Sequence, residues 1–197
     1  SSKIIFRSKH PAFSTRLNRP KGVLMDLKVL KAKVRDIPDF PKKGVLFRDI
    51  TPLLKDAKLL KEVIARLARS LKGKKIGAVV GIESRGFIFG SALATKLGVG
   101  FVPIRKKGKL PWKTKQVACT LEYGQEILEI HEDAVKRGER AVIVDDLLAT
   151  GGTAAAAAKL VKSVGGKVAK IAFVIELEFL KGREKLKGYD VFSLIKY

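Results

Sequence analysis

Residues 141–157 read AVIVDDLLATGGTAAAA, and this stretch decides the fold. It begins with an apolar, β-branched run, which is typical of a strand covered on both faces in a parallel sheet. Two adjacent carboxylates, Asp145 and Asp146, end the run, and a turn of small residues then leads into a helix. Ligands of open α/β sheets bind at the carboxyl ends of the strands, so the stretch predicts a binding site as well as an architecture.

The turn itself has the features of a monophosphate site. Gly151 and Gly152 let the backbone approach a ligand closely, Thr150 and Thr153 add hydroxyl donors, and Ala149 adds no bulk. The amides at the start of the following helix would face the phosphate. The paired aspartates before the turn can accept hydrogen bonds from a sugar diol. Together they indicate a ribose 5-phosphate, although helix capping and an ordinary turn would explain either feature alone.

The rest of the chain alternates between strand and helix patterns. Apolar residues recur at helical spacing from Ala57 to Leu71, whereas short β-branched runs indicate buried strands. The alternation predicts an α/β fold with a mainly parallel sheet flanked by helices. Residues 106–120 are basic and contain Gly108, Pro111 and the only Trp, so we expect an exposed loop there. The expected strands are 76–82, 100–104, 141–147 and 168–177, and the expected helices after 57–71 are 87–98 and 153–166.

Length and composition narrow the class of protein. A chain of 197 residues predicts one domain, and the longest apolar runs are far shorter than the roughly 20 residues that a membrane-spanning helix needs. The single cysteine, Cys119, excludes an intramolecular disulfide and favours a reducing cytoplasm. The net charge of +22 points to an anionic partner, either a nucleic acid, an acidic surface or a phosphorylated small molecule.

The first 24 residues differ from the rest. They contain six basic residues and no acidic one, and the only methionine, Met25, follows them at the start of a helical pattern. We therefore expect a basic extension over 1–24 and the domain over 25–197, which still carries a net charge of +16. A non-native segment, a targeting segment and an anion-binding arm all fit the extension.

Six blocks of sequence resemble one enzyme family. IVDDLLATGGT (143–153) is similar to the phosphoribosyl pyrophosphate (PRPP) signature of the type I phosphoribosyltransferases. Five more blocks resemble the branch of that family that acts on adenine: DFPKKGVLFRDITPLLKD (39–56), GIESRGFIFG (81–90), IRKKGKLP (104–111), LEYG (121–124) and LKGREKL (180–186). The resemblance implies the type I phosphoribosyltransferase fold with a flexible hood loop. It also implies a purine salvage reaction in which adenine and PRPP give AMP and pyrophosphate.

The same resemblance assigns roles to individual residues. Glu122 in LEYG would be the catalytic general acid/base at the adenine N7, with Tyr123 beside it. The hood, through Gln116, would close over the reactants and exclude water. The peptide between Glu83 and Ser84 would be cis. Pyrophosphate would be bound by Glu83, Ser84, Arg85, Arg105, Lys106 and Lys109, some of them reaching the site from the neighbouring subunit of a homodimer.

Adenine would lie between Phe47 and Leu147, with the backbone around Leu46 and Arg48 pairing with its edge. Magnesium is expected as a cofactor held by PRPP oxygens and water, so no dedicated ligand cluster is predicted. Trp112 has no assigned role.

One alternative function stays open at this point. A regulator on the same fold could bind nucleic acid and use PRPP or a nucleotide as its effector, and the +16 charge of residues 25–197 favours it. The presence of Glu122 and of the hood sequence favours the enzyme.

Overall fold

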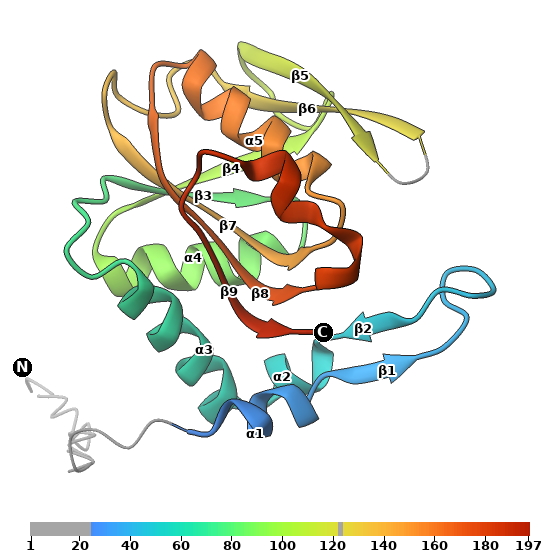
Figure 1. The fold of residues 1–197 in the computed structure, drawn as a ribbon. Helices are drawn as coiled ribbons and strands as arrows, with labels where there is room; N and C mark the ends of the chain where they lie inside the picture. The colour runs from blue at the N-terminus through green and yellow to red at the C-terminus, as the bar shows by residue number, and fades with distance from the viewer. Residues whose placement is uncertain (1–24, 122–123) are drawn as a thin grey trace, which may run out of the picture.

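A seven-stranded sheet forms the centre of the computed structural model, which describes residues 25–121 and 124–197 (Figure 1). The strand order is β5-β6-β4-β3-β7-β8-β9, in which β6 is antiparallel to both of its neighbours, β5 and β4, and all other neighbouring pairs are parallel. The predicted mainly parallel sheet is therefore confirmed. In chain order its strands are β3 (Ala78–Ile82), β4 (Gly100–Lys106), β5 (Thr114–Leu121), β6 (Gly124–His131), β7 (Arg140–Leu148), β8 (Lys167–Glu176) and β9 (Val191–Lys196).

Helices cover both faces of this sheet, as predicted. α3 (Ala57–Ser70) and α4 (Gly86–Leu97) lie on one face and α5 (Gly152–Ser163) on the other (Figure 1). Successive strand residues point to opposite faces, so Val79 packs with α3 and α4 while Val80 packs with α5. This double burial is the reason why β3 and β7 are almost continuously apolar.

The prediction of an exposed loop over 106–120 is wrong for the second half of that segment. β4 extends to Lys106, and β5 starts at Thr114 and pairs along its whole length with β6. Gly108, Pro111 and Trp112 suggested a loop and do lie in the connection before β5, but Lys106 belongs to β4 and Lys115 to β5. Within β5 the side chain of Cys119 is buried against α5 while Ala118 is exposed, as in a strand with one covered face.

The segment from Met25 to Lys55 forms a small unit at one end of the molecule (Figure 1). It contains α1 (Leu27–Ala32), the antiparallel strands β1 (Arg35–Ile37) and β2 (Phe47–Asp49), and α2 (Thr51–Lys55). The helix expected after Met25 is present as α1. Two 3₁₀ helices, η1 (Glu178–Leu180) and η2 (Gly182–Leu186), connect β8 to β9. The predicted extension 1–24 lies outside the described residues.

No helix in the described part of the chain combines the length and apolar character needed to cross a bilayer.

Candidate active site

The carboxyl ends of β4, β3 and β7, three neighbouring strands, open into one cavity of about 410 Å³. Eight of its nine lining residues are predicted site residues, so the fold brings together side chains that are more than 60 positions apart in the chain. The lining residues are Glu83, Ser84, Arg85, Lys106, Glu126, Asp145, Asp146, Leu147 and Thr153.

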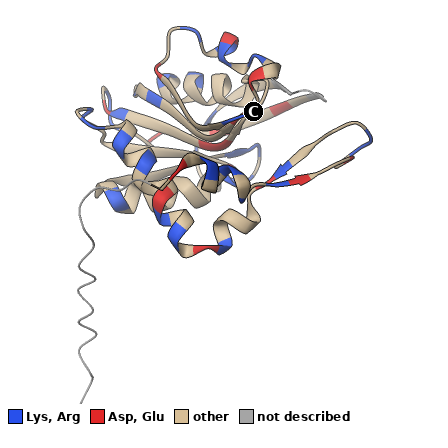
Figure 2. Cartoon of the chain, turned by 60° about the horizontal axis from the view of Figure 1, so that its bottom comes forward, with Lys and Arg blue, Asp and Glu red and all other residues tan. Residues whose placement is uncertain are grey.

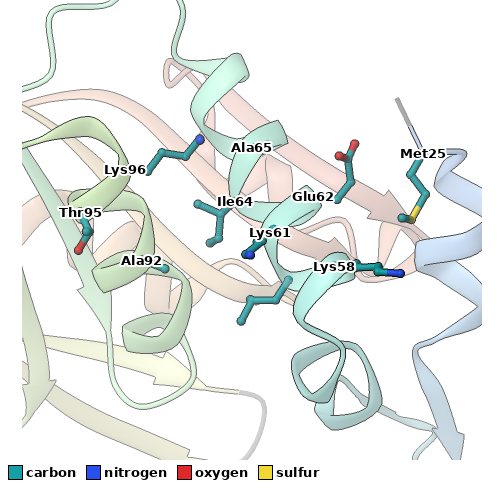
Figure 3. Close-up of a pocket in the computed structure, with 10 residues that line it drawn as sticks. Met25, Lys58, Lys61, Glu62, Ile64, Ala65, Ala92, Thr95 and Lys96 are labelled. Atoms are coloured by element: carbon teal, nitrogen blue, oxygen red, sulfur yellow. The ribbon is translucent and has the colours of Figure 1, made fainter. Parts of the chain in front are cut away.

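A larger cavity of about 940 Å³ lies elsewhere, between α3, α4 and Met25 (Figure 3). Its rim carries Lys58, Lys61 and Lys96, and Glu62 is the one carboxylate among its described lining residues. It contains no predicted site residue. The smaller cavity is therefore the candidate active site, because it combines carboxylates, cations and a helix start.

The two aspartates at the end of β7 form the floor of this site. Asp146 is buried and forms an ion pair with Arg85, whose Nε lies 2.8 Å from Oδ2. The backbone amide of Asp146 donates to Oδ1 of Asp145 at 2.9 Å. Burial raises the pKa of both carboxyl groups, and the charge of Asp146 raises that of Asp145 further, whereas Arg85 opposes both shifts. Such displaced pKa values mark sites where charge is held for binding or chemistry.

The turn after β7 has the left-handed conformation that its glycines allow. Gly151 has a φ of 78° and precedes α5 without a side-chain cap, so the first amides of the helix are not occupied by a capping side chain. Thr153 from the first turn of α5 lines the cavity. The arrangement is suited to receive an anion at the helix N-terminus.

Gly182, in the LKGREKL block, packs directly against this turn. A Cβ at Gly182 would lie 2.1 Å from the carbonyl oxygen of Ala149, and one at Gly151 would lie 2.3 Å from the carbonyl oxygen of Gly182. The two backbones therefore touch, and side chains are excluded from both positions. Sequence reasoning included Gly182 in a matching block but assigned it no role.

Residues 83–86 (ESRG), which follow β3, contribute a cation and a cis peptide. The bond between Glu83 and Ser84 is cis, as the resemblance implies. Glu83 itself binds the guanidinium of Arg105 through both carboxylate oxygens, at 3.1 and 3.2 Å, and accepts the amide of Lys106 at 3.1 Å. The hydrogen bond from Arg105 lowers the pKa of Glu83. Its carboxylate therefore holds a neighbouring cation in place.

The basic residues at the end of β4 and just after it occupy different positions. Lys106 lines the cavity and pairs with Glu126 of β6, whose hydrogen bond raises the pKa of the lysine. Neither Arg105 nor Lys109 belongs to the described lining. The backbone oxygen of Lys109 accepts from Arg105 at 3.1 Å, and its amide donates to Glu129 at 3.0 Å.

Two acidic residues of β6 were missed by the sequence analysis. Glu126 faces the cavity, and Glu129 is 2% exposed and accepts the amides of Lys109 and Leu110. Glu129 thereby fixes the connection between β4 and β5. No motif in the sequence distinguishes either residue from a surface glutamate.

The predicted adenine residues lie on two elements. Leu147 lines the cavity, while Phe47 of β2 lies under the guanidinium of Arg85, 5.2 Å from the ring centroid. Leu46 is exposed just before β2. The side chain of Arg48 is turned toward Asp36 and Tyr197. Glu122 and Tyr123, the predicted acid/base residue and its neighbour, lie outside the described residues.

Comparisons with known proteins agree on one family. The model of the phosphoribosyl transferase domain matches residues 51–196. Adenine phosphoribosyltransferase of Thermoanaerobacter pseudethanolicus is 58% identical over 173 residues, which cover 88% of this chain and 100% of the relative. Its crystal structure superposes with a TM-score of 0.85 over 87% of this chain and 100% of that one. The Saccharomyces cerevisiae enzyme, solved with an imino-altritol bisphosphate and adenine, is 43% identical, with a TM-score of 0.81 over 85% and 97% of the two chains.

Proposed function

The chain belongs to the phosphoribosyl transferase domain family, and from this we propose that it converts adenine and PRPP into AMP and pyrophosphate. The observation that carries the proposal is the single cavity where the paired aspartates, Arg85 and the start of α5 meet. The relatives named adenine phosphoribosyltransferase, and the yeast enzyme solved with adenine, support the choice of base. This reading is preferred over a nucleic-acid-binding regulator.

In the proposed reaction, N9 of adenine forms a bond to the ribose C1, and the bond from C1 to the pyrophosphate oxygen breaks. Asp145 and Asp146 would accept hydrogen bonds from the ribose hydroxyls, while the amides of Ala149 to Thr153 bind the 5-phosphate. The leaving pyrophosphate would be stabilised by Arg85 and Lys106, and by Arg105 in the orientation that Glu83 gives it. Glu122 would move the proton at the adenine N7.

Magnesium fits this site as an ion held mainly by the substrate. In the described part of the chain no three His, Cys, Asp or Glu side chains form a metal-binding group, but Asp145 and Asp146 supply two nearby carboxylates. Mg²⁺ keeps several waters and often binds through phosphate oxygens together with one or two carboxylates. When bound, the ion offsets the negative charge of the pyrophosphate.

We propose further that the enzyme works as a homodimer in a reducing cytoplasm. Lys109 lies outside the described cavity lining, and its side chain would reach the site of a neighbouring subunit. Cys119 is a buried free thiol.

The test is AMP formation from adenine and PRPP, measured beside hypoxanthine, guanine and xanthine. We expect turnover with adenine and at most traces with the 6-oxopurines. Equal turnover with hypoxanthine would contradict the adenine assignment, and no turnover with any base would contradict the enzyme assignment.

A further inference from the structure

Tyr197, which follows β9, connects the end of the large sheet to the unit formed by Met25 to Lys55 (Figure 1). Its ring contacts two cations, with the Arg48 guanidinium 3.8 Å and the Lys31 ammonium 4.2 Å from the centroid. Its hydroxyl donates to the carbonyl oxygen of Lys31 at 3.3 Å, and Lys31 in turn donates to the carbonyl oxygen of Lys196 at 2.6 Å. Tyr197 is therefore held by α1 and β2 together.

Arg48 belongs to β2 and connects the ring of Tyr197 to that strand. Its side chain is only 13% exposed, and it forms an ion pair with Asp36, its register partner on β1. A guanidinium over an aromatic ring is attracted more strongly when it is withdrawn from water. The ring of Tyr197 and the carboxylate of Asp36 thus fix the Arg48 side chain, and with it the β2 backbone.

Strand β2 depends on such side-chain contacts for its position. It pairs with β1 in a separate two-stranded sheet, and no ladder of the described residues joins it to the seven-stranded sheet. On the site side, Phe47 lies under Arg85, which pairs with Asp146. A continuous series of contacts therefore runs from Tyr197 through β2 to the floor of the cavity.

We propose that Tyr197 is a positioning residue for the base: through Arg48 it holds strand β2 in the place where Phe47 and the neighbouring backbone meet adenine. This inference rests on the proposed function. It concerns the base more than the phosphates, because Arg85 is held by its ion pair with Asp146 and the ribose and 5-phosphate are proposed to bind at β7 and α5. The loss of Tyr197 should therefore affect the two substrates unequally.

The experiment compares steady-state kinetics of the full-length chain with those of Tyr197→Leu and Tyr197→Phe. In Tyr197→Leu we expect the KM for adenine to rise about three- to tenfold, the range of a partly buried cation–π contact. We expect the KM for PRPP to stay within about twofold and Tyr197→Phe, which keeps the ring, to restore most of the affinity. A matched control is Tyr189→Leu. The ring of Tyr189 also contacts a cation, the Lys162 ammonium 4.6 Å from its centroid, but Tyr189 packs on the α5 side of the sheet.

Arg48→Lys gives a second approach that does not depend on the folding of Tyr197→Leu. Lysine keeps a positive charge beside Asp36 but lacks the flat guanidinium, so the same rise in the KM for adenine is expected. An unchanged KM for adenine in Arg48→Lys, or a parallel change in both KM values in Tyr197→Leu, would overturn the inference. Failure of the proposed function is distinguishable, because the unsubstituted chain would then form no AMP.

Discussion

At the scale of single residues, the site holds two neighbouring carboxylates, of which Asp146 is buried and Asp145 is half-buried. Asp146 has a cation to compensate it, because Arg85 lies 2.8 Å away. Asp145 accepts one backbone amide and faces the negative charge of its neighbour. Burial of a charge without full compensation is unfavourable. The two carboxylates that are proposed to bind the ribose diol are therefore expected to lower the free energy of unfolding.

Replacing Asp145 with the isosteric Asn should reveal this cost. A raised native pKa means that the carboxyl favours the folded state below its unfolded pKa, and that this contribution is lost as the pH rises through the native pKa. We expect Asp145→Asn to raise the Tm by about 2–4 °C at neutral pH, as for a change near 1 kcal/mol in a chain of this size. The gain should shrink toward about pH 4, where Asp145 is protonated.

The measurement is thermal unfolding across this pH range, beside the KM for PRPP, which should rise. Asp133→Asn, at an exposed position, is the control and should leave the Tm unchanged. A lower Tm at neutral pH for Asp145→Asn would show that the carboxylate stabilises the fold.

Glu126 places a negative charge in a cavity that we expect to receive a polyanion. Its carboxylate pairs with Lys106, so it competes with the pyrophosphate for that ammonium. Glu126→Gln keeps an oxygen that can accept from Lys106 and removes the charge. We expect the KM for PRPP to fall about threefold or more, because a like charge within several Å is removed from a partly desolvated site.

Glu132→Gln is the control for this change, since Glu132 pairs with Lys115 on the same hairpin at 3.1 Å but does not line the cavity. A higher KM for PRPP in Glu126→Gln would indicate instead that the full ion pair is needed to place Lys106.

At the scale of elements, the phosphate turn depends on a backbone contact made from outside its own sequence. η2 starts at Gly182, which abuts Ala149 with no room for a Cβ. Gly182→Ala should therefore push the turn toward the cavity, destabilise the fold by about 1–3 kcal/mol as other overpacked sites do, and raise the KM for PRPP. The checks are urea unfolding and steady-state kinetics.

Gly100→Ala serves as the comparison, because a Cβ at Gly100 meets nothing within 4 Å. If Gly182→Ala keeps both the stability and the KM for PRPP of the unsubstituted chain, η2 has no part in shaping the turn.

The elements also explain why sequence reasoning succeeded in one region and failed in another. The strand, turn and helix around Asp145 and Gly151 are contiguous in the chain. The residue types there favour a buried strand, a turn and a helix without help from distant partners. The pair of strands β5 and β6 is different, since Cys119 pairs with Glu126 on the neighbouring strand and its burial depends on α5. Glu126, Glu129 and Tyr197 acquire their roles only through partners that are distant in the chain or across strands.

At the scale of the whole molecule, positive charge far exceeds negative charge. The sequence has 41 Lys and Arg against 19 Asp and Glu, and Figure 2 shows the cations of the described residues spread over several helices and loops rather than gathered on one element. Many of the acidic side chains in the described part of the chain are engaged in ion pairs, for example Glu62 with Arg66 and Glu176 with Arg183. The net charge of +22 gives the chain a positive field, which should attract anionic substrates toward the protein.

This field predicts a salt dependence that differs between the two substrates. Added KCl screens exposed charges over a Debye length of about 10 Å at 0.1 M, so kcat/KM for the polyanionic PRPP should fall severalfold between about 0.02 and 0.2 M salt. Adenine is neutral, and its kcat/KM at saturating PRPP should stay nearly constant. Potassium acetate should act like KCl at equal ionic strength, because screening depends on charge and not on the identity of the anion. An equal fall for both substrates would place the salt effect on the chemical step or on folding, and the field would then have no role in substrate capture.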